Sequence, residues 1–444
     1  MTKILISYYK VQEIPVNKTL CLWDGLTQEL TKNGNDVLLI NTAYFNPYKI
    51  NTVGNKKINR QILTTAKQFD PDLIITFNHK IPKCILDHFT DVPIVIYDGD
   101  ELGFFSDLEY VEENINRYTL FSIVNEWRQG YLDFGFNNKQ IHYMPVGTPI
   151  KAEDIPQDKN ISFLGTIHYN SGKLCKLIKK HEYDSTFKQI ITEQLNTSSY
   201  DYEDLFRKYF EDEYDSLGLT EIDLFPMFNH RIITLINLLD LGLHINGYRW
   251  NMVTKILPQL AAVCSPELMW TVEENQNYFN SSKISINPIH PQAKGSGFSW
   301  RVFDIMASNA CLVCEHSSDL KALTKDYLDI PMYHTPWEAR EICKELLNDD
   351  NARKEIVLAS QKYIEENARW VHRFKEMENI LNIKLINPGE TGKLINLVED
   401  EEFIEQCAEF RRKKFGKKIS LKNKIRYRIW RHFNKILKKK RIIK

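Results

Sequence analysis

The sequence has no apolar run long enough to cross a bilayer, since a spanning helix needs about 20 consecutive apolar residues. The region that comes nearest, residues 232–245, is interrupted by Asn237 and Asp240. The apolar run at the start of the chain ends at Ser7 without a small-residue cleavage site, which favours a β-strand over a signal peptide. We therefore expect a cytoplasmic protein.

The sequence also lacks the cysteine pattern of a disulfide framework or of a zinc site. Its eight cysteines are scattered through apolar segments, as is typical of buried thiols in a reducing compartment. Cys311 and Cys314 form a CxxC pair, but it lies in an apolar run and no second pair of metal ligands accompanies it. We interpret this pair as core packing, and we expect neither a metal nor a cofactor.

Acidic residues are absent from residues 411–444, although the chain as a whole has a net charge of zero. This tail carries 17 lysines and arginines, which leaves the rest of the chain with a net charge of −17. Its apolar residues recur mainly at helical spacing, with basic residues between them: Ile425, Ile429, Phe433, Ile436 and Leu437. With Tyr427 and Trp430 as interfacial anchors, the pattern predicts a helix that docks on the anionic inner face of the cytoplasmic membrane.

Two alternatives for the tail remain open. The helix could pack on the acidic body of the same chain, and basic runs also attract phosphate backbones. We expect no nucleic-acid partner.

Strand-like runs alternate with helical patterns along most of the chain, which predicts α/β architecture with parallel sheets. The expected strands of the first part are residues 4–8, 37–41, 73–77, 94–97, 121–125 and 141–145, and those of the second are 161–165, 243–246, 284–287 and 311–314. A chain of 444 residues is long enough for two cores. We expect two doubly wound, Rossmann-like domains.

The domain boundaries follow changes in composition. We assign residues 1–150 to a first domain, residues 151–160 to a polar linker and residues 161–382 to a second domain. An acidic, aromatic-rich segment at about 169–229 is interpreted as a helical insertion. Residues 383–444 are expected to form a helical extension that ends in the basic tail.

The segment 284–313 carries the most chemical information, because it predicts a strand, a glycine-containing loop, a helix and another strand. Gly295 and Gly297 would let the backbone approach an anion, with help from amides at the helix start. Lys294 and Arg301 would stabilise a leaving diphosphate without a metal, and Asp304 could bind ribose hydroxyls. The alternative is a solvated turn followed by a surface pair of Arg301 and Asp304.

At this point the chain resembles the group 1 glycosyltransferases, in particular the branch similar to bacterial spore-maturation glycosyltransferases. The resemblance is most specific in Asn287-Pro288, Arg301-Val-Phe-Asp304 and the strand that ends near Val313. Weaker matches are Met144-Pro-Val-Gly147, Phe163-Leu-Gly165, Gly247-Tyr-Arg-Trp250 and the helix that contains Glu366-Asn-Ala-Arg-Trp-Val-His-Arg373. The resemblance implies a GT-B architecture in which the first domain, residues 1–150, binds the acceptor and the second, residues 161–382, binds the donor. It also implies that the last helix crosses back to the first domain.

Two departures from the family pattern concern the site. Asp304 stands where the family usually has Glu, and Ser296 stands where retaining members carry a Glu near the donor sugar. The resemblance therefore leaves open whether the reaction retains or inverts the sugar's configuration. The donor-binding residues that we predict are Gly165, Lys173, His290, Lys294, Gly295, Ser296, Gly297, Ser299, Arg301 and Asp304.

An inverting transfer needs a base near the acceptor hydroxyl, and ligands of parallel sheets bind at the carboxyl ends of strands. Asp100 is our first candidate, because Gly99 frees its backbone while Asp98 can cap the turn. His79, after the strand 73–77, is the alternative. Glu126 could orient the acceptor or cap the next helix.

The sequence thus predicts an enzyme that transfers a sugar from a nucleotide diphosphate to a bacterial surface glycan or lipid-linked acceptor. Two other functions remain open. One is a nucleotide-sugar epimerase of the same fold, and the other is a non-catalytic glycan-binding scaffold docked on a membrane by its tail.

Overall fold

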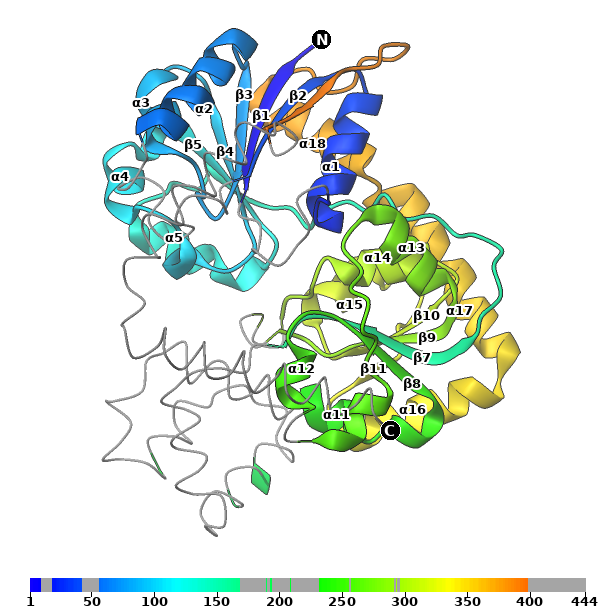
Figure 1. The fold of residues 1–444 in the computed structure, drawn as a ribbon. Coiled ribbons are helices and arrows are strands. Elements are labelled where there is room, and N and C mark those ends of the chain that lie inside the picture. The colour runs from blue at the N-terminus through cyan, green and yellow to red at the C-terminus, as the bar shows by residue number, and fades with distance from the viewer. Residues whose placement is uncertain are drawn as a thin grey trace, which may run out of the picture.

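The computed structural model describes residues 1–8, 18–41, 56–167, 231–254, 257–290 and 296–397, together with the isolated residues 189, 192, 193, 208 and 293. The chain forms two α/β domains, each with a parallel sheet between helices (Figure 1). Helices cover both faces of each sheet, as the doubly wound prediction requires. The predicted GT-B-like architecture is confirmed.

The first sheet has seven strands in the order β12-β2-β1-β3-β4-β5-β6. Six of them come from the first part of the chain: β1 (Lys3–Tyr8), β2 (Asp36–Asn41), β3 (Leu73–Phe77), β4 (Ile94–Asp98), β5 (Tyr118–Ser122) and β6 (Ile141–Tyr143). The helices between them are α1 (Cys21–Lys32), α2 (Lys56–Phe69), α3 (Lys83–His88), α4 (Leu108–Glu113) and α5 (Arg128–Phe134). β1, β3 and β4 are rich in β-branched residues and are almost wholly buried, as expected for strands covered on both faces.

The second sheet has five strands in the order β11-β10-β9-β7-β8. Its strands are β7 (Lys159–Leu164), β8 (Leu243–Asn246), β9 (Ser282–Asn287), β10 (Cys311–Glu315) and β11 (Met332–Tyr333). α11 (Ile232–Ile236), α12 (Trp250–Val253) and α16 (Pro336–Asn348) pack on one face. α13 (Val272–Asn280), α14 (Arg301–Ala307), α15 (Ser318–Thr324) and α17 (Asp350–Tyr363) lie in the core on the other.

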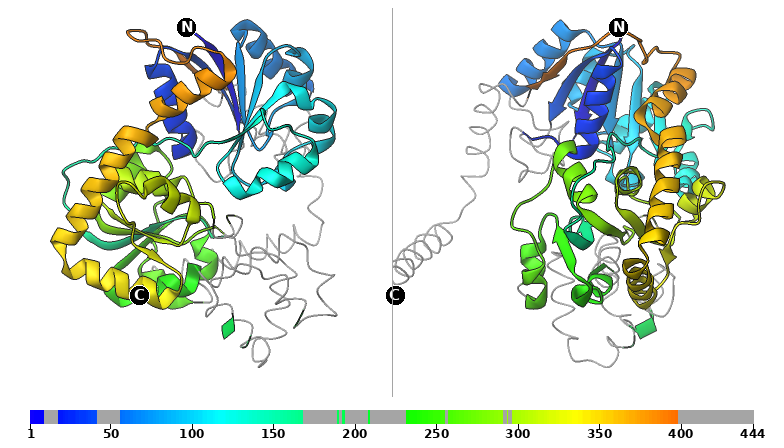
Figure 2. Two further views of the ribbon diagram at one scale, coloured as in Figure 1. Left: turned by 180° about the vertical axis from the view of Figure 1, so that it is seen from behind. Right: turned by 90° about the vertical axis from the view of Figure 1, so that its right-hand side faces the viewer.

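The end of the second domain returns to the first. α17 continues through a π-helical turn to α18 (Trp370–Leu381), whose Trp370, Phe374 and Met377 belong to the core of the first domain. Both views of Figure 2 show this run of helices passing from one domain to the other. The crossing helix that the family resemblance implied is present.

The described part of the C-terminal extension is a strand and not the helix that we expected. β12 (Leu394–Asn396) adds to the edge of the first sheet in parallel with β2. Pro388, Gly389 and Gly392 interrupt any helical pattern, and Gly392 packs so closely on Asn35 that an added Cβ would lie 1.8 Å from the Asn35 carbonyl oxygen.

No helix among these described residues is both long and apolar enough to span a membrane.

Candidate active site

The carboxyl edge of the second sheet gathers buried cationic and amide donors. Arg231 precedes α11 and is 3% exposed. Its Nη1 donates to the Thr166 carbonyl oxygen over 2.7 Å and its Nη2 to the Pro288 carbonyl oxygen over 3.3 Å, so the side chain joins the ends of β7 and β9. Burial lowers the pKa of Arg231 to about 9, and the neighbouring Arg301 adds to this effect.

Arg301 lies at the start of α14 on the same edge. Its guanidinium stacks over the Trp300 ring, 5.3 Å from the ring centroid, and burial lowers its pKa. Within the described part of the chain, the Nε atoms of Arg231 and Arg301 have no hydrogen-bond partner. Two partly desolvated guanidiniums that repel each other form a site that an anion would stabilise.

Asn287 and Glu315 end the two central strands of this edge. The Asn287 Oδ1 accepts from the Ser299 hydroxyl over 3.1 Å, whereas its buried Nδ2 lacks a partner among the residues described. Burial raises the pKa of Glu315 to about 8, although its carboxylate accepts from the Ile289 amide over 3.0 Å. Glu315 is therefore largely protonated at neutral pH, and the net charge contributed by these four side chains is positive.

The described backbone amides of the loop before α14 make hydrogen bonds within the loop and not the anion contacts that we predicted. The amides of Ser296 and Gly297 both donate to the Ala293 carbonyl oxygen, over 3.0 and 3.1 Å. A Cβ on Gly297 would lie 2.5 Å from Val124 Cγ2 of the first domain. In this structure Gly297 is required by contact between the domains, and neither amide points at a ligand.

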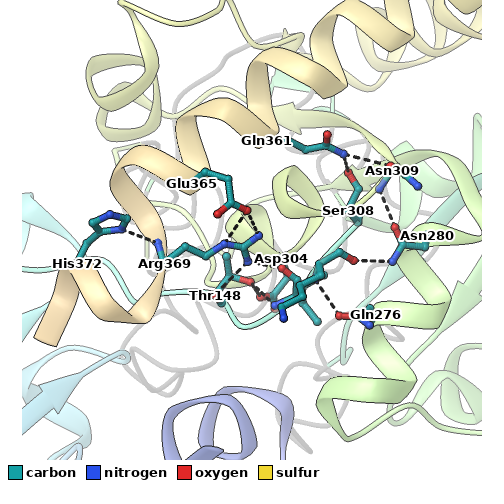
Figure 3. Close-up of polar contacts among 12 residues, drawn as sticks. Thr148, Gln276, Asn280, Asp304, Ser308, Asn309, Gln361, Glu365, Arg369 and His372 are labelled. Atoms are coloured by element: carbon teal, nitrogen blue, oxygen red, sulfur yellow. Dashed lines mark hydrogen bonds and ion pairs between the residues drawn. The ribbon is translucent and has the colours of Figure 1, made fainter. Parts of the chain in front are cut away.

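Asp304 is buried at the hinge between the domains and is not open to a ribose. The Thr148 hydroxyl donates to Asp304 Oδ1 over 2.6 Å, and Figure 3 shows this pair beside Arg369 and Glu365. Asp304 is 4% exposed, and burial raises its pKa to about 6. The carboxylate of Asp304 thus faces Thr148 and not the carboxyl edge of the sheet.

Gly165 also has a packing role that the sequence did not reveal. Its amide donates to the Asn246 carbonyl oxygen over 2.9 Å, and its own carbonyl accepts from the Trp250 indole over 2.7 Å. The amide and the carbonyl of Gly165 are thus both engaged in hydrogen bonds within the second domain. Gly247 packs directly against it, with positive φ of 146°.

In the first domain, Asp100 follows β4 and is half-buried. The Asn78 amide group donates to Asp100 Oδ2 over 2.6 Å, and burial raises the pKa of Asp100. As predicted, Asp98 caps the turn, because its Oδ1 accepts from the Asp100 amide over 3.2 Å. Asn78 and Glu101 have positive φ, which marks a tightly constrained loop at this strand end.

His79 does not reach the surface, so the structure contradicts its proposed role as a base. It is 0% exposed, and its two ring nitrogens are bonded to the Ser106 carbonyl oxygen and to the Tyr118 hydroxyl. Burial lowers its pKa to about 4, which keeps the ring neutral. An imidazole with both nitrogens occupied inside the core cannot accept a proton from a bound acceptor.

With this geometry in place, the comparison with known families is informative. Residues 233–379, which include Arg301, Asp304 and Glu315, match the family model described as glycosyl transferase-like. The match lies in the second domain and the crossing helix, and it shows that this part of the chain is similar to glycosyltransferases.

Several solved structures match the chain at low sequence identity. HepE of Anabaena in complex with UDP-glucose is 11% identical, with a TM-score of 0.45, and the alignment covers 86% of this chain and 100% of that one. Sucrose-phosphate synthase of Thermosynechococcus elongatus is 9% identical, with a TM-score of 0.47 and coverage of 85% and 98%. The N-terminal domain of Candida albicans trehalose-6-phosphate phosphatase is 10% identical, with a TM-score of 0.48 and coverage of 86% and 97%. No curated protein matches the chain in sequence.

The structure places some of the predicted donor residues together and separates others. Ser299 and Arg301 lie at the edge with Asn287, and His290 follows the same strand, β9. Asp304 lies at the hinge, while Ser296 and Gly297 face the first domain. Lys173, Lys294, Gly295 and the tail 411–444 lie outside the described residues, as does nearly all of the insertion 169–229.

The sequence patterns did not indicate Arg231 as a site residue. The residue adjoins the insertion, where we had assigned no function, and no short motif surrounds it. The available signal was its position just before the helix that leads to a strand of the second sheet, since the loops before such helices meet at the carboxyl edge.

Proposed function

We propose that the enzyme transfers a sugar from a nucleotide-diphosphate donor whose diphosphate binds between Arg231 and Arg301. The observation that carries this proposal is the pair of neighbouring guanidiniums, each with an unpartnered Nε among the described residues, at the carboxyl edge of a glycosyltransferase domain. Ligands of open parallel sheets bind at this edge.

The chemistry of the leaving group supports the same placement. As the bond between the sugar and the diphosphate breaks, negative charge grows on the phosphate oxygen, and fixed positive charges stabilise it. Two guanidiniums supply that charge, so the proposal includes neither a metal nor another cofactor. The Asn287 Nδ2 lies at the same edge and is a further donor for a phosphate oxygen.

On the acceptor side, we propose Asp100 as the base. It follows a strand end of the first sheet, and Asn78 fixes the orientation of its carboxylate. Burial raises the pKa of Asp100, which makes it a stronger base than an ordinary aspartate. Ser296 has no carboxyl group, and the proposal therefore favours inversion at the sugar over retention.

The acceptor in this proposal is a bacterial surface glycan or a lipid-linked precursor. Its support is the basic tail 411–444, whose composition suits an anionic membrane surface on the cytoplasmic side. Liposome co-sedimentation tests this part with the full chain and a version that ends at Glu399. Loss of pelleting on truncation is expected with anionic vesicles, and equal pelleting of both proteins would contradict membrane docking.

A nucleotide panel followed by a transfer assay tests the whole proposal. A nucleoside diphosphate that binds only the folded enzyme raises its melting temperature. With the matching nucleotide sugar, the wild type should release nucleoside diphosphate when an acceptor is present, and Arg301→Gln should not. Arg60→Ala, an exposed arginine on α2, is the matched control. Interconversion of the nucleotide sugar without any acceptor would contradict transfer.

A further inference from the structure

The loop before α14 touches the first domain at a second place, away from the hinge. There it meets the segment that follows β5, which includes the short 3-10 helix η3 (Asn125–Trp127). The Ser296 hydroxyl donates to Glu126 Oε2 over 2.8 Å, and the Asn125 amide donates to Asp319 Oδ2 over 3.2 Å. We call residues 124–126, 296–297 and 319 the interdomain clasp.

The clasp is continuous with the internal structure of the loop. The Ser296 carbonyl accepts from the Asp319 amide over 3.0 Å and from the Ser317 hydroxyl over 2.7 Å. Val124 fills the space beside Gly297, and Trp300 packs on the core of the first domain. The clasp therefore fixes the path of the chain just before Arg301.

The polar contacts of the clasp lie at the surface. Asn125 and Glu126 are exposed, and hydrogen bonds in contact with water are individually weak. The clasp also brings together two carboxylates: burial raises the pKa of Asp319, and the nearby Glu126 raises it further. Such a contact forms and breaks with small changes in free energy, whereas the hydrophobic contact of Trp300 does not depend on it.

We propose that the clasp couples closure of the two domains to the shape of the donor site, with Glu126 and Asp319 as positioning residues. When the clasp is formed, the loop enters α14 in one direction and Arg301 stands beside Arg231. When it is broken, the loop is released and the diphosphate site is incomplete. This inference rests on the proposed function, because it assigns a control to the same donor site.

Donor kinetics of clasp variants test the coupling. Glu126→Ala and Ser296→Ala remove the same hydrogen bond, so each should raise the donor KM by about 3- to 10-fold, and the double variant should be no worse than either single one. The value of kcat should stay within about twofold, because neither residue touches the reacting atoms. Glu126→Gln keeps an acceptor oxygen and should restore the wild-type KM.

Glu113→Ala is the matched control, since Glu113 is an exposed carboxylate on α4 of the same domain. Additive effects of the two alanine variants, an unchanged KM, or a fall in kcat alone would overturn the proposal.

Hydrogen exchange gives a second readout that needs no nucleotide. Asp319→Ala removes the acceptor of the Asn125 amide, so exchange should speed up in 123–127 and 296–300 and stay unchanged in the core strands. Unaltered exchange in both segments would overturn the clasp. If the wild type bound no nucleotide, the proposed function and the coupling would fail together, whereas faster exchange would still show that the clasp exists.

Discussion

Thr148 and Asp304 are joined by a hydrogen bond of 2.6 Å at the hinge, the first from the segment between the domains and the second from the helix that Arg301 begins. The Thr148 amide also donates to the Ala368 carbonyl oxygen over 3.0 Å, where the chain returns to the first domain. Thr148 thus connects α14 to both segments of the chain that cross between the domains.

Removing the Thr148 hydroxyl should destabilise the protein without changing its shape. Thr148→Val leaves a buried carboxylate without its donor, which costs about 1–3 kcal/mol. Thr148→Ser keeps the hydroxyl and should melt close to the wild type. Thermal unfolding compares the three proteins, and a valine variant as stable as the wild type would show that the bond has no energetic role.

Asp304 should make stability depend on pH in a defined direction. Burial raises its folded-state pKa from 3.8 to about 6, so the folded state holds an extra proton between those values. Protonated Asp304 therefore makes its full contribution to the free energy of unfolding at low pH. This contribution, on the order of 3 kcal/mol, is lost as the pH rises through about 6.

Asp304→Asn cannot titrate and isolates this contribution. The melting temperature of the variant relative to the wild type should be higher at about pH 7.5 than at about pH 4. An equal difference at both values would contradict the assignment. Other buried acids such as Asp98 titrate in both proteins and cancel in the comparison.

Asp100 and His79 should behave differently on substitution. Asp100→Asn should lower kcat by roughly 10²- to 10⁴-fold and leave the melting temperature nearly unchanged. His79→Gln should lower the melting temperature, since it disturbs two buried hydrogen bonds, while kcat per folded molecule is preserved. A large loss of kcat in His79→Gln with an unchanged melting temperature would indicate instead that His79 is the base.

The close contact between Gly297 and Val124 can be tested with two substitutions that compensate for each other in size. A methyl group at Gly297 would collide with Val124, so Gly297→Ala should weaken donor binding. Val124→Ala added to that variant makes room for the methyl group and should recover most of the affinity. Calorimetry with the nucleotide provides the measurement, and failure of the second change to restore binding would place the effect elsewhere.

The sequence predicted most strands because their buried, β-branched runs are local signals. β12 was missed, since it has three residues and pairs with β2 across most of the chain length. A strand of that size exists only through its tertiary partner, which no local pattern reveals. Gly34 follows the end of α1 with a φ of 78°, and a glycine at such a position is itself a local signal.

The residues of the candidate site were predictable only where local sequence signals place them. The pattern of strand, loop and helix predicted the position of Arg301, and the strand-end rule predicted that of Asp100. Neither says which way a side chain points. Left-handed backbone at Asn78 and His79 accompanies the burial of the imidazole between Ser106 and Tyr118. Whether Asp304 faces the donor or the hinge depends on Thr148, which is 156 positions away.

The most direct test of the account is calorimetric titration of nucleoside diphosphates into the wild type and into Arg231→Gln, Arg301→Gln and Arg60→Ala. The account predicts that one nucleotide binds the wild type and Arg60→Ala equally. Both glutamine variants should lose roughly tenfold or more in affinity, as expected for a lost charge-assisted contact, while they remain folded by circular dichroism. Nucleotide binding that is unchanged in both glutamine variants would contradict a diphosphate site between these two arginines.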